Sequence, residues 1–262
     1  MGLTGAVAAL RGALGFLSRI PVGATDDGWE AFRRTPAAMP AVGYALGPLV
    51  ALPVAAAALA PVRVPSLTVA AAFVAWLYLV TGITHLDGVA DLGDAAVVHG
   101  DADRRREVLK DSALGVGGTL ALALVVLGLA TAATVIADLA RLSLVDAVVL
   151  VVAAEVGAKA ATAALVCVGD APHEGLGSAL TEESGPRSLV GVALVTAPAT
   201  LLGWPRVLPG VVALGAALAT GALLARWATR RLGGVSGDVL GATNELARVA
   251  ALHAGVIAWT LS

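Results

Sequence analysis

The sequence predicts an all-α protein, a polytopic transmembrane helical bundle of about six to seven spans. Hydrophobic residues make up 58 % of the 262 residues and charged residues only 14 %, whereas soluble domains contain roughly 45–50 % and 25 %. The apolar residues also form long runs, and a spanning helix needs about 20 of them. We therefore expect a single integral membrane domain over residues 1–262, with the lipid bilayer as its surroundings.

Seven segments of the chain are predicted as spans. The fifth is short and contains Pro198, whose ring removes a backbone donor and disturbs a helix. The first seventeen residues are weakly apolar and predict an interfacial or re-entrant helix. The predicted spans are 40–60, 65–84, 117–137, 144–168, 188–203, 207–225 and 246–261.

Basic residues are divided unevenly between the two sides of these spans. Twelve lysines and arginines lie in the N-terminal segment and in alternate loops, while the other loops hold only Arg63, Arg141 and Arg206. Because cytoplasmic loops carry an excess of these residues, the first side is predicted to be cytoplasmic in a cell membrane. It also holds every long polar segment, which indicates an active site at the inner membrane surface; these segments are 20–39, 85–116, 169–187 and 229–244.

The net charge argues against a nucleic-acid partner, and the cysteine content argues against disulfides and thiolate metal sites. The formal net charge is −2, and proteins that bind nucleic acid carry a basic surface. Cys167 is the only cysteine, which excludes an intrachain disulfide and a zinc site built on several thiolates.

The segment after the second predicted span carries a regular stripe of aspartates. Asp87, Asp91 and Asp94 are spaced i, i+4 and i+7, so a helix would place the three carboxylates on one face. Like charges four residues apart destabilise a helix, and a bound cation would offset that repulsion. Carboxylate oxygens without thiolates or clustered histidines indicate Mg²⁺ or Mn²⁺. The alternative is a solvated loop whose acids balance the arginines of 104–106.

Cations and a hydroxyl follow this stripe. Arg104, Arg105, Lys110 and Ser112 lie within one loop of the aspartates, and cations beside a metal site suit the recognition of phosphate. For the arginines, the excess of positive charge expected on the cytoplasmic side is an equally good explanation.

A second polar stretch precedes the last predicted span. Ser236, Asp238, Asn244 and Glu245 lie among glycines and, by the predicted topology, on the same side as the aspartate stripe. They are candidates for binding substrate. Asn244 or Thr243 would alternatively cap the last helix, with Glu245 favouring its positive end.

Two ionisable residues fall inside the fourth predicted span. Glu155 and Lys159 are four residues apart, and charges at this depth are costly unless they are paired or functional. We expect a mutual ion pair that faces the interior of the bundle.

Several motifs together resemble the cobalamin synthases, also called adenosylcobinamide-GDP ribazoletransferases. They are His-Leu-Asp-Gly-Val-Ala-Asp at 85–91, Lys-Asp-Ser at 110–112, Ser-Gly-Asp-Val-Leu-Gly-Ala-Thr-Asn-Glu at 236–245, Phe-Leu-Ser-Arg-Ile-Pro at 16–21 and Gly-Leu-Gly at 175–177. The resemblance implies an integral membrane, Mg²⁺-dependent transferase. It would join adenosylcobinamide-GDP to α-ribazole, or to its 5′-phosphate, and release GMP; the sequence leaves this choice and the oligomeric state, including a homo-oligomer, open.

The resemblance also implies roles for the candidate residues. Asp87 and Asp91, with Asp94, would hold Mg²⁺ on the pyrophosphate, and an acid of this stripe or His85 would accept the proton of the attacking hydroxyl. Lys110 and an arginine of 104–106 would stabilise the departing GMP. Ser112 and Ser236 would contact substrate, whereas Asp238, Asn244 and Glu245 would bind substrate or a second metal.

Two other functions compete with this interpretation. Another Mg²⁺-dependent membrane phosphotransferase of the CDP-alcohol type would also use clustered aspartates, and Asp87-Gly88 matches the start of its pattern, but no Ala-Arg follows at the expected place. An ion-coupled transporter would depend on Glu155 and Lys159 and would not need Asp87.

Overall fold

The computed structural model describes residues 2–23, 25–111 and 113–262, and within these ranges it contains helices and no strand. The predicted all-α class is therefore confirmed. The α-helices are α1 (Leu3–Leu17), α2 (Asp26–Arg33), α3 (Ala38–Val50), α4 (Leu52–Leu59), α5 (Ser66–Thr81), α6 (Thr84–Val97), α7 (Ala102–Val108), α8 (Val116–Leu142), α9 (Leu144–Val168), α10 (Leu176–Thr181), α11 (Leu189–Thr196), α12 (Leu208–Arg231) and α13 (Gly237–Thr260).

The number of candidate spans is smaller than predicted. In the described residues, four helices are long and apolar enough to cross a membrane, namely α3 continued by α4, α8, α9 and α12. Helices α5 and α6 pass the same test only as a pair, and the pair is bent by 103°. The structure thus provides four candidate spans, or five with the bent pair, where the sequence predicted six to seven.

Two predicted spans account for most of this difference. Segment 188–203 folds into α11, which has only 8 residues, followed by the 3₁₀-helix Ala197–Leu201 around Pro198. This is too short to cross a bilayer. Segment 246–261 is the second half of α13, which carries Glu245 and Arg248 inside the bundle and is not among the long apolar helices.

Helix α9 forms the centre of the bundle. In its most apolar window 83 % of the residues are buried, against 33–39 % for the other three long helices. An α-helix with apolar residues on every face is typically buried among other helices or in a membrane. Small residues let its neighbours approach: a Cβ added at Gly43 or Gly47 of α3 would lie 2.7 or 2.6 Å from the Cα of Val156 or Val152 of α9. This Gly-x-x-x-Gly contact is typical of helices packed in membranes.

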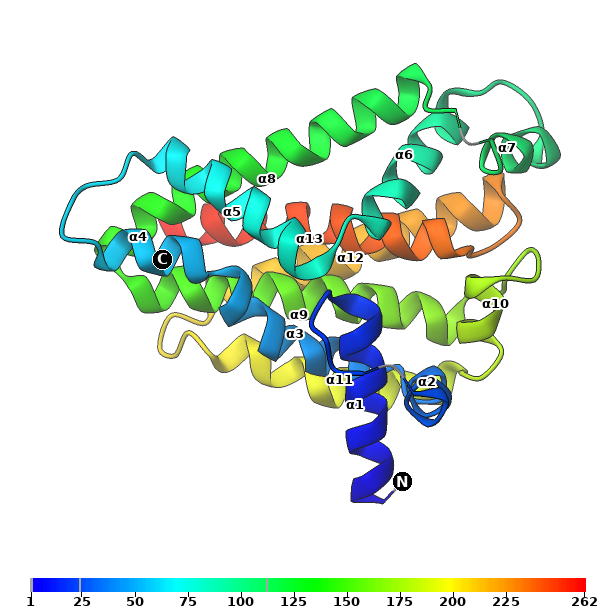
Figure 1. Ribbon diagram of the computed structural model, residues 1–262, viewed down its shortest axis with the longest axis horizontal. Helices are drawn as coiled ribbons and strands as arrows, with labels where there is room; N and C mark the ends of the chain where they lie inside the picture. The colour runs from blue at the N-terminus through cyan, green and yellow to red at the C-terminus, as the bar shows by residue number, and fades with distance from the viewer. Residues whose placement is uncertain (1, 24, 112) are drawn as a thin grey trace.

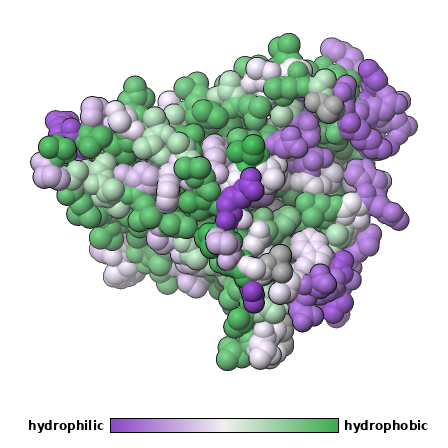
Figure 2. Space-filling view, viewed as in Figure 1, coloured by the Kyte–Doolittle hydropathy of each residue, from purple (hydrophilic) through white to green (hydrophobic). Residues whose placement is uncertain are grey.

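The polar segments gather at one end of the molecule. Figure 1 shows α2, α7, α10 and the turn between α12 and α13 toward one end, and the turns between α4 and α5 and between α8 and α9 toward the other. Hydrophilic residues are concentrated over the first end, while the middle of the molecule is mostly hydrophobic (Figure 2). We refer to the end formed by α2, α7 and α10 as the polar end.

Helix α1 runs across the long helices instead of along them (Figure 1). Ala9, Ala13 and Leu17 are buried, whereas Leu3 and Val7 are 84 % and 58 % exposed. Its exposed apolar side chains are those that an interfacial helix places in the boundary of a bilayer. The predicted interfacial position of residues 1–17 agrees with this arrangement and stays a prediction.

Candidate active site

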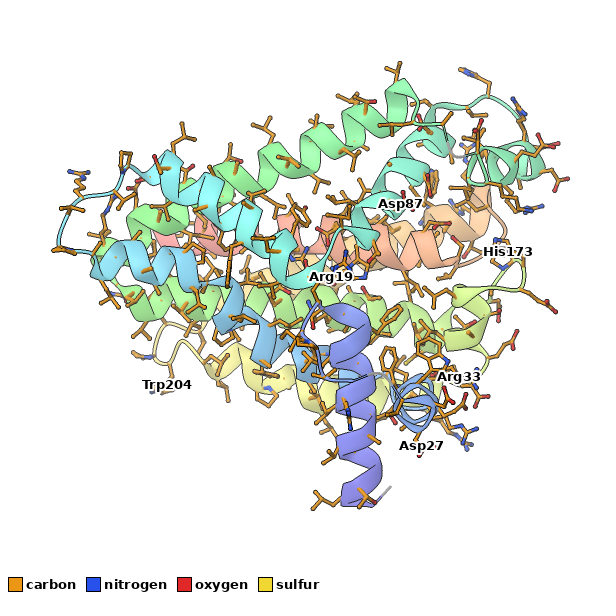
Figure 3. The ribbon with its side chains drawn as sticks, viewed as in Figure 1. Arg19, Asp27, Arg33, Asp87, His173 and Trp204 are labelled. Atoms are coloured by element: carbon orange, nitrogen blue, oxygen red, sulfur yellow. The ribbon has the colours of Figure 1, made fainter. Side chains whose placement is uncertain are left out.

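The aspartate stripe lies on α6, which begins directly after a break in the chain. The break is at Gly82, whose φ of 79° ends α5, and α6 leaves it at 103° to α5. Thr84–Val97 is helical, so Asp87, Asp91 and Asp94 share one face of a helix, as predicted. Asp87 is in the first turn and is exposed; Figure 3 shows it at the start of α6.

Helix α13 brings a fourth carboxylate to this stripe. A Cβ added at Gly88 would lie 2.5 Å from the carbonyl oxygen of Asp238, so only glycine permits this approach of α6 to the start of α13. Burial, followed by the negative charges of Asp238, Asp87 and Asp94, raises the pKa of Asp91 to about 6. The two polar stretches that the sequence placed on one side therefore meet, and they form a concentration of negative charge without a compensating cation in that set.

The Asp94 carboxylate accepts hydrogen bonds from the backbone at the start of α8. Its Oδ2 accepts a hydrogen bond from the Gly115 N–H at 2.8 Å, and its Oδ1 accepts one from the Gly118 N–H at 2.9 Å. These donors belong to the N-terminus of α8, whose first N–H groups have no partner within the helix. Asp94 therefore caps α8 from a different helix and fixes α6 against it.

The acidic group offers oxygen ligands of the kind that a magnesium ion prefers. Among the described residues, no three Asp, Glu, His or Cys side chains are arranged so that they could hold a metal by themselves. Mg²⁺, however, is usually bound by one or two carboxylates together with water and substrate phosphates. Exposed Asp87 and half-buried Asp91 offer two oxygen ligands of the required kind, and burial together with the nearby carboxylates of Asp238, Asp87 and Asp94 raises the pKa of Asp91. The residues therefore fit such an ion.

Two of the three predicted phosphate-binding cations have partners within the protein. Arg104 pairs with Glu107 at 2.8 Å. Arg105 is buried, and its Nη1 donates to the Ala95 carbonyl at the C-terminal end of α6 at 2.5 Å. Lys110 is exposed beyond the end of α7, and Ser112 lies outside the described residues. The structural contacts of the two arginines leave Lys110 as the freer candidate for an anion, and all four assignments stay predictions.

The stretch 236–245 is helical almost throughout, not a loop before the last helix. Helix α13 begins at Gly237, and the hydroxyl of Ser236 caps it by accepting from the Val239 N–H at 3.4 Å. The expectation that Thr243 or Asn244 caps this helix is therefore wrong. The physical reason is that Ser236 supplies the cap two turns earlier and that the polar residues within the helix find buried partners.

Asn244 and Glu245 are directed at His85 on α6. Asn244 Nδ2 lies 3.1 Å from His85 Nδ1, and Glu245 Oε1 lies 3.7 Å from the same nitrogen. Asn244 and Glu245 are each only 1 % exposed, and their predicted role in binding substrate or a second metal stays a prediction. This arrangement leaves Nε2 as the ring nitrogen of His85 that is free of these partners.

A buried ionic group extends this contact into the bundle. Arg248 lies with Nη1 2.6 Å from Glu245 Oε1 and with Nε 2.5 Å from Glu155 Oε1, and Lys159 forms an ion pair with Glu155. All four side chains are 1 % or 2 % exposed. The predicted pair of Glu155 and Lys159 is thus confirmed, within a group of two acids and two bases that balances its charge. We call these four residues the ionic group.

Two cavities of similar size flank the start of α6. One has a volume of about 520 Å³, and we call it the His85 cavity; it is lined by Gly15, Phe16, Leu17, Met39, Thr84, His85, Thr162, His173, Leu176, Leu180, Gly237, Asp238, Leu240 and Gly241. The other has a volume of about 540 Å³, and we call it the Asp87 cavity; it is lined by Ile83, Thr84, Leu86, Asp87, Ala90, Leu114 and Leu122.

Sequence reasoning missed two basic residues near this site. Arg248 was not noticed, although its place three residues after Glu245 is the spacing of a helical ion pair. Arg19 received no role, although its motif contributed to the resemblance. Its backbone N–H donates to the Val80 carbonyl at 2.7 Å, and a Cβ at Gly82 would lie 3.1 Å from its Nε. Arg19 therefore places a cation at the break before α6 (Figure 3).

Comparison with known proteins identifies the family of this chain. Residues 9–256 match the family described as cobalamin-5-phosphate synthase. The chain belongs to this family. A relative from Halorubrum lacusprofundi named adenosylcobinamide-GDP ribazoletransferase is 67 % identical over 96 % of this chain and 98 % of its own length. Relatives of the same name from Haloquadratum walsbyi and Halobacterium salinarum are 46 % and 52 % identical over 97 % and 76 % of this chain, and 99 % and 98 % of their own lengths.

Membership of the cobalamin-5-phosphate synthase family confirms the resemblance that the motifs predicted and makes the chain a transferase. The matches do not favour the CDP-alcohol alternative. No solved structure matches the chain.

Proposed function

We propose that the chain is an adenosylcobinamide-GDP ribazoletransferase, which joins adenosylcobinamide-GDP to α-ribazole or its 5′-phosphate and releases GMP. The name of a relative that is 67 % identical over nearly the whole chain supports this activity. The observation that carries it structurally is the meeting of α6 and α13, which groups Asp87, Asp91 and Asp238 with His85 beside two cavities. Carboxylates, a histidine and room for two substrates are what a transfer between phosphate and hydroxyl requires.

The proposed reaction breaks a phosphoanhydride bond and forms a phosphoester bond. A ribose hydroxyl oxygen of the acceptor bonds to the phosphorus on the cobinamide side, and the bond from that phosphorus to the oxygen of GMP breaks. The hydroxyl proton passes to Nε2 of His85, or to a carboxylate of the stripe, as a general base. Asn244 and Glu245 hold His85 in place, whereas Lys110 and Arg19 offer positive charge to the departing GMP.

Asp87 and Asp91 are the proposed ligands of Mg²⁺. When bound there, the ion would neutralise the pyrophosphate and withdraw charge from the leaving group. The charges of the four nearby carboxylates favour a cation at this position, and the oxygen-only ligands favour a hard one. Asp94 fixes α6 to α8 beside them through its two backbone hydrogen bonds.

The Asp94→Asn variant separates capping from metal binding. An amide offers one acceptor oxygen where the carboxylate offers two, so we expect the free energy of unfolding to fall by about 1 kcal/mol, the usual contribution of a cap. The Mg²⁺ concentration at half-maximal activity should change less than twofold. Thermal unfolding in detergent and a Mg²⁺ titration of activity measure the two effects. A large rise in the Mg²⁺ requirement with unchanged stability would make Asp94 a ligand instead.

We also propose that the polar end faces the cytoplasm of a cell membrane. The basic residues of α2, of α7 and of the last turn of α12 support this orientation, because cytoplasmic loops carry an excess of Lys and Arg. Labelling of single cysteines introduced at Asp27 and Trp204, in intact cells, tests it: only the Trp204 position, near the opposite end (Figure 3), should react with a membrane-impermeant reagent.

One assay tests the proposed activity. The purified protein in detergent is incubated with adenosylcobinamide-GDP, α-ribazole and Mg²⁺, and both GMP and the complete corrinoid are measured. We expect equimolar amounts of the two products, and none after chelation of divalent cations. Absence of product from protein that is folded and monodisperse would refute the proposal. The same assay with α-ribazole 5′-phosphate identifies the preferred acceptor.

A further inference from the structure

The two cavities beside α6 differ in how they are built. The His85 cavity is enclosed by α1, α3, α6, α9, α10 and α13 and extends to the loop before α10, whereas the Asp87 cavity is bounded by residues of α6 and α8 and the segments before each of them. Thr84 lines both. His85 and Asp87 are two residues apart on one helix, so their side chains leave its axis about 200° apart. The start of α6 therefore presents a histidine to one cavity and a carboxylate to the other.

We propose that the His85 cavity is the binding site of the nucleoside acceptor and that the corrinoid nucleotide binds on the other side of α6, at the Asp87 cavity. This inference rests on the proposed function and adds the place of each substrate. It also assigns a specificity-determining role to the walls of the His85 cavity, in particular to Leu176 of α10.

The size of the His85 cavity suits the nucleoside acceptor. A volume of about 520 Å³ lies within the range of roughly 300–1,000 Å³ that accommodates drug-sized ligands. A nucleoside of about 20 non-hydrogen atoms is such a ligand. A corrinoid that carries two nucleosides is several times larger than either cavity, so most of it has to stay outside. Among the described residues, the Asp87 cavity has walls only from α6, α8 and the segments before them, and it therefore suits one end of such a molecule better than the His85 cavity, which six helices surround.

The lining of the His85 cavity matches the two parts of a nucleoside. Most of the apolar side chains come from α1, α3 and α10, and Leu240 of α13 adds one more; the others are Phe16, Leu17, Met39, Leu176 and Leu180. Three hydrogen-bonding groups, those of Thr84, His85 and Asp238, lie on α6 and α13, and Thr162 and His173 line the cavity elsewhere. An aromatic base packs well against the first group, and this places the ribose hydroxyls toward the second. The hydroxyl that reacts then lies on the side of His85.

Substrates on opposite sides of α6 also suit the geometry of the reaction. In phosphoryl transfer the attacking and leaving oxygens lie roughly in line, on opposite sides of the phosphorus. An acceptor that comes from the His85 cavity and a leaving GMP on the side of Asp87 satisfy this requirement. The pyrophosphate would then lie over the start of α6, near Thr84, which both cavities share.

Two matched variants test this assignment. Leu176 and Leu114 are 40 % and 58 % exposed leucines that line the His85 cavity and the Asp87 cavity respectively, so replacement of either by Trp adds bulk without disturbing the core. We expect Leu176→Trp to raise the KM for α-ribazole about tenfold or more and to change the KM for adenosylcobinamide-GDP less than twofold. Leu114→Trp should leave the KM for α-ribazole within twofold and raise that for the corrinoid.

Direct binding separates the inference from the proposed function. Equilibrium dialysis of α-ribazole alone against the wild type and both Trp variants should show about tenfold weaker binding only for Leu176→Trp. If that variant does not fold, Leu176→Ala is used, and a several-fold loss of α-ribazole affinity is expected from the lost contact. A wild type that turns over both substrates, but whose Leu176 variants alter only the corrinoid KM, would overturn the assignment. A wild type without turnover would refute the proposed function instead.

Discussion

Replacement of Asp87 by Asn is expected to lower kcat by at least about 100-fold, with the fold intact. A metal that neutralises a reacting phosphate contributes several kcal/mol to the stability of the transition state, and each 1.36 kcal/mol corresponds to a factor of ten in rate. Asp87 is exposed in the first turn of α6, and Asn has nearly the same shape, so the loss should not arise from unfolding. The Mg²⁺ concentration at half-maximal activity should rise in parallel.

A matched control for this variant is Asp27→Asn. Asp27 is also an exposed acid in the first turn of a helix, α2, at the polar end (Figure 3). Loss of either acid removes a favourable interaction with a helix dipole of roughly 0.3–1 kcal/mol, so both variants should lose similar stability. Only Asp87→Asn should lose activity. GMP release by Asp87→Asn at the wild-type rate, with the wild-type response to Mg²⁺, would show that the metal assignment is wrong.

The aspartate stripe was predictable from the sequence because its determinants are local. Residues spaced i, i+4 and i+7 lie on one face of any α-helix. Residues Thr84–Val97 do form a helix, so the predicted common face is confirmed. The meeting of α6 with Asp238 required the topology as well, which the distribution of basic residues supplied by placing both stretches on one side. The capping role of Asp94 was not predictable, since it depends on a contact with Gly115 and Gly118 across a loop.

The sequence predicts more spans than the structure contains because an apolar run reveals the composition of a segment but not how that segment packs. Segment 188–203 is apolar enough, but Pro198 and the 3₁₀ turn around it shorten it. In helix α13 the opposite error arises, because a polar sequence lies within a helix. Asn244 and Glu245 are residue types typical of the start of a helix, so the sequence predicts a loop before them. Their partners, His85 and Arg248, make them stable within a helix, and His85 lies 159 residues away from Asn244 in the chain.

Replacement of Arg248 by Leu is expected to destabilise the protein by about 3–5 kcal/mol, the usual effect of removing one partner of a buried ion pair. Arg248 contacts Glu155 and Glu245 at once. Without it the ionic group holds two carboxylates and the single cation of Lys159, so one buried negative charge has no balancing cation within the group. Thermal unfolding in detergent, with the loss of helical circular dichroism as the signal, measures the change.

Two comparisons show whether buried charge is the cause. Arg206→Leu removes an arginine from an ion pair with Asp146 at the opposite end of the bundle, where the arginine side chain is 55 % exposed; such pairs contribute only about 0–1 kcal/mol. The double variant Arg248→Leu with Glu245→Gln restores the balance of one acid and one base, and should recover part of the stability. If the double variant is no more stable than Arg248→Leu alone, the lost packing of the arginine side chain, and not the unbalanced charge, is the cause of the destabilisation.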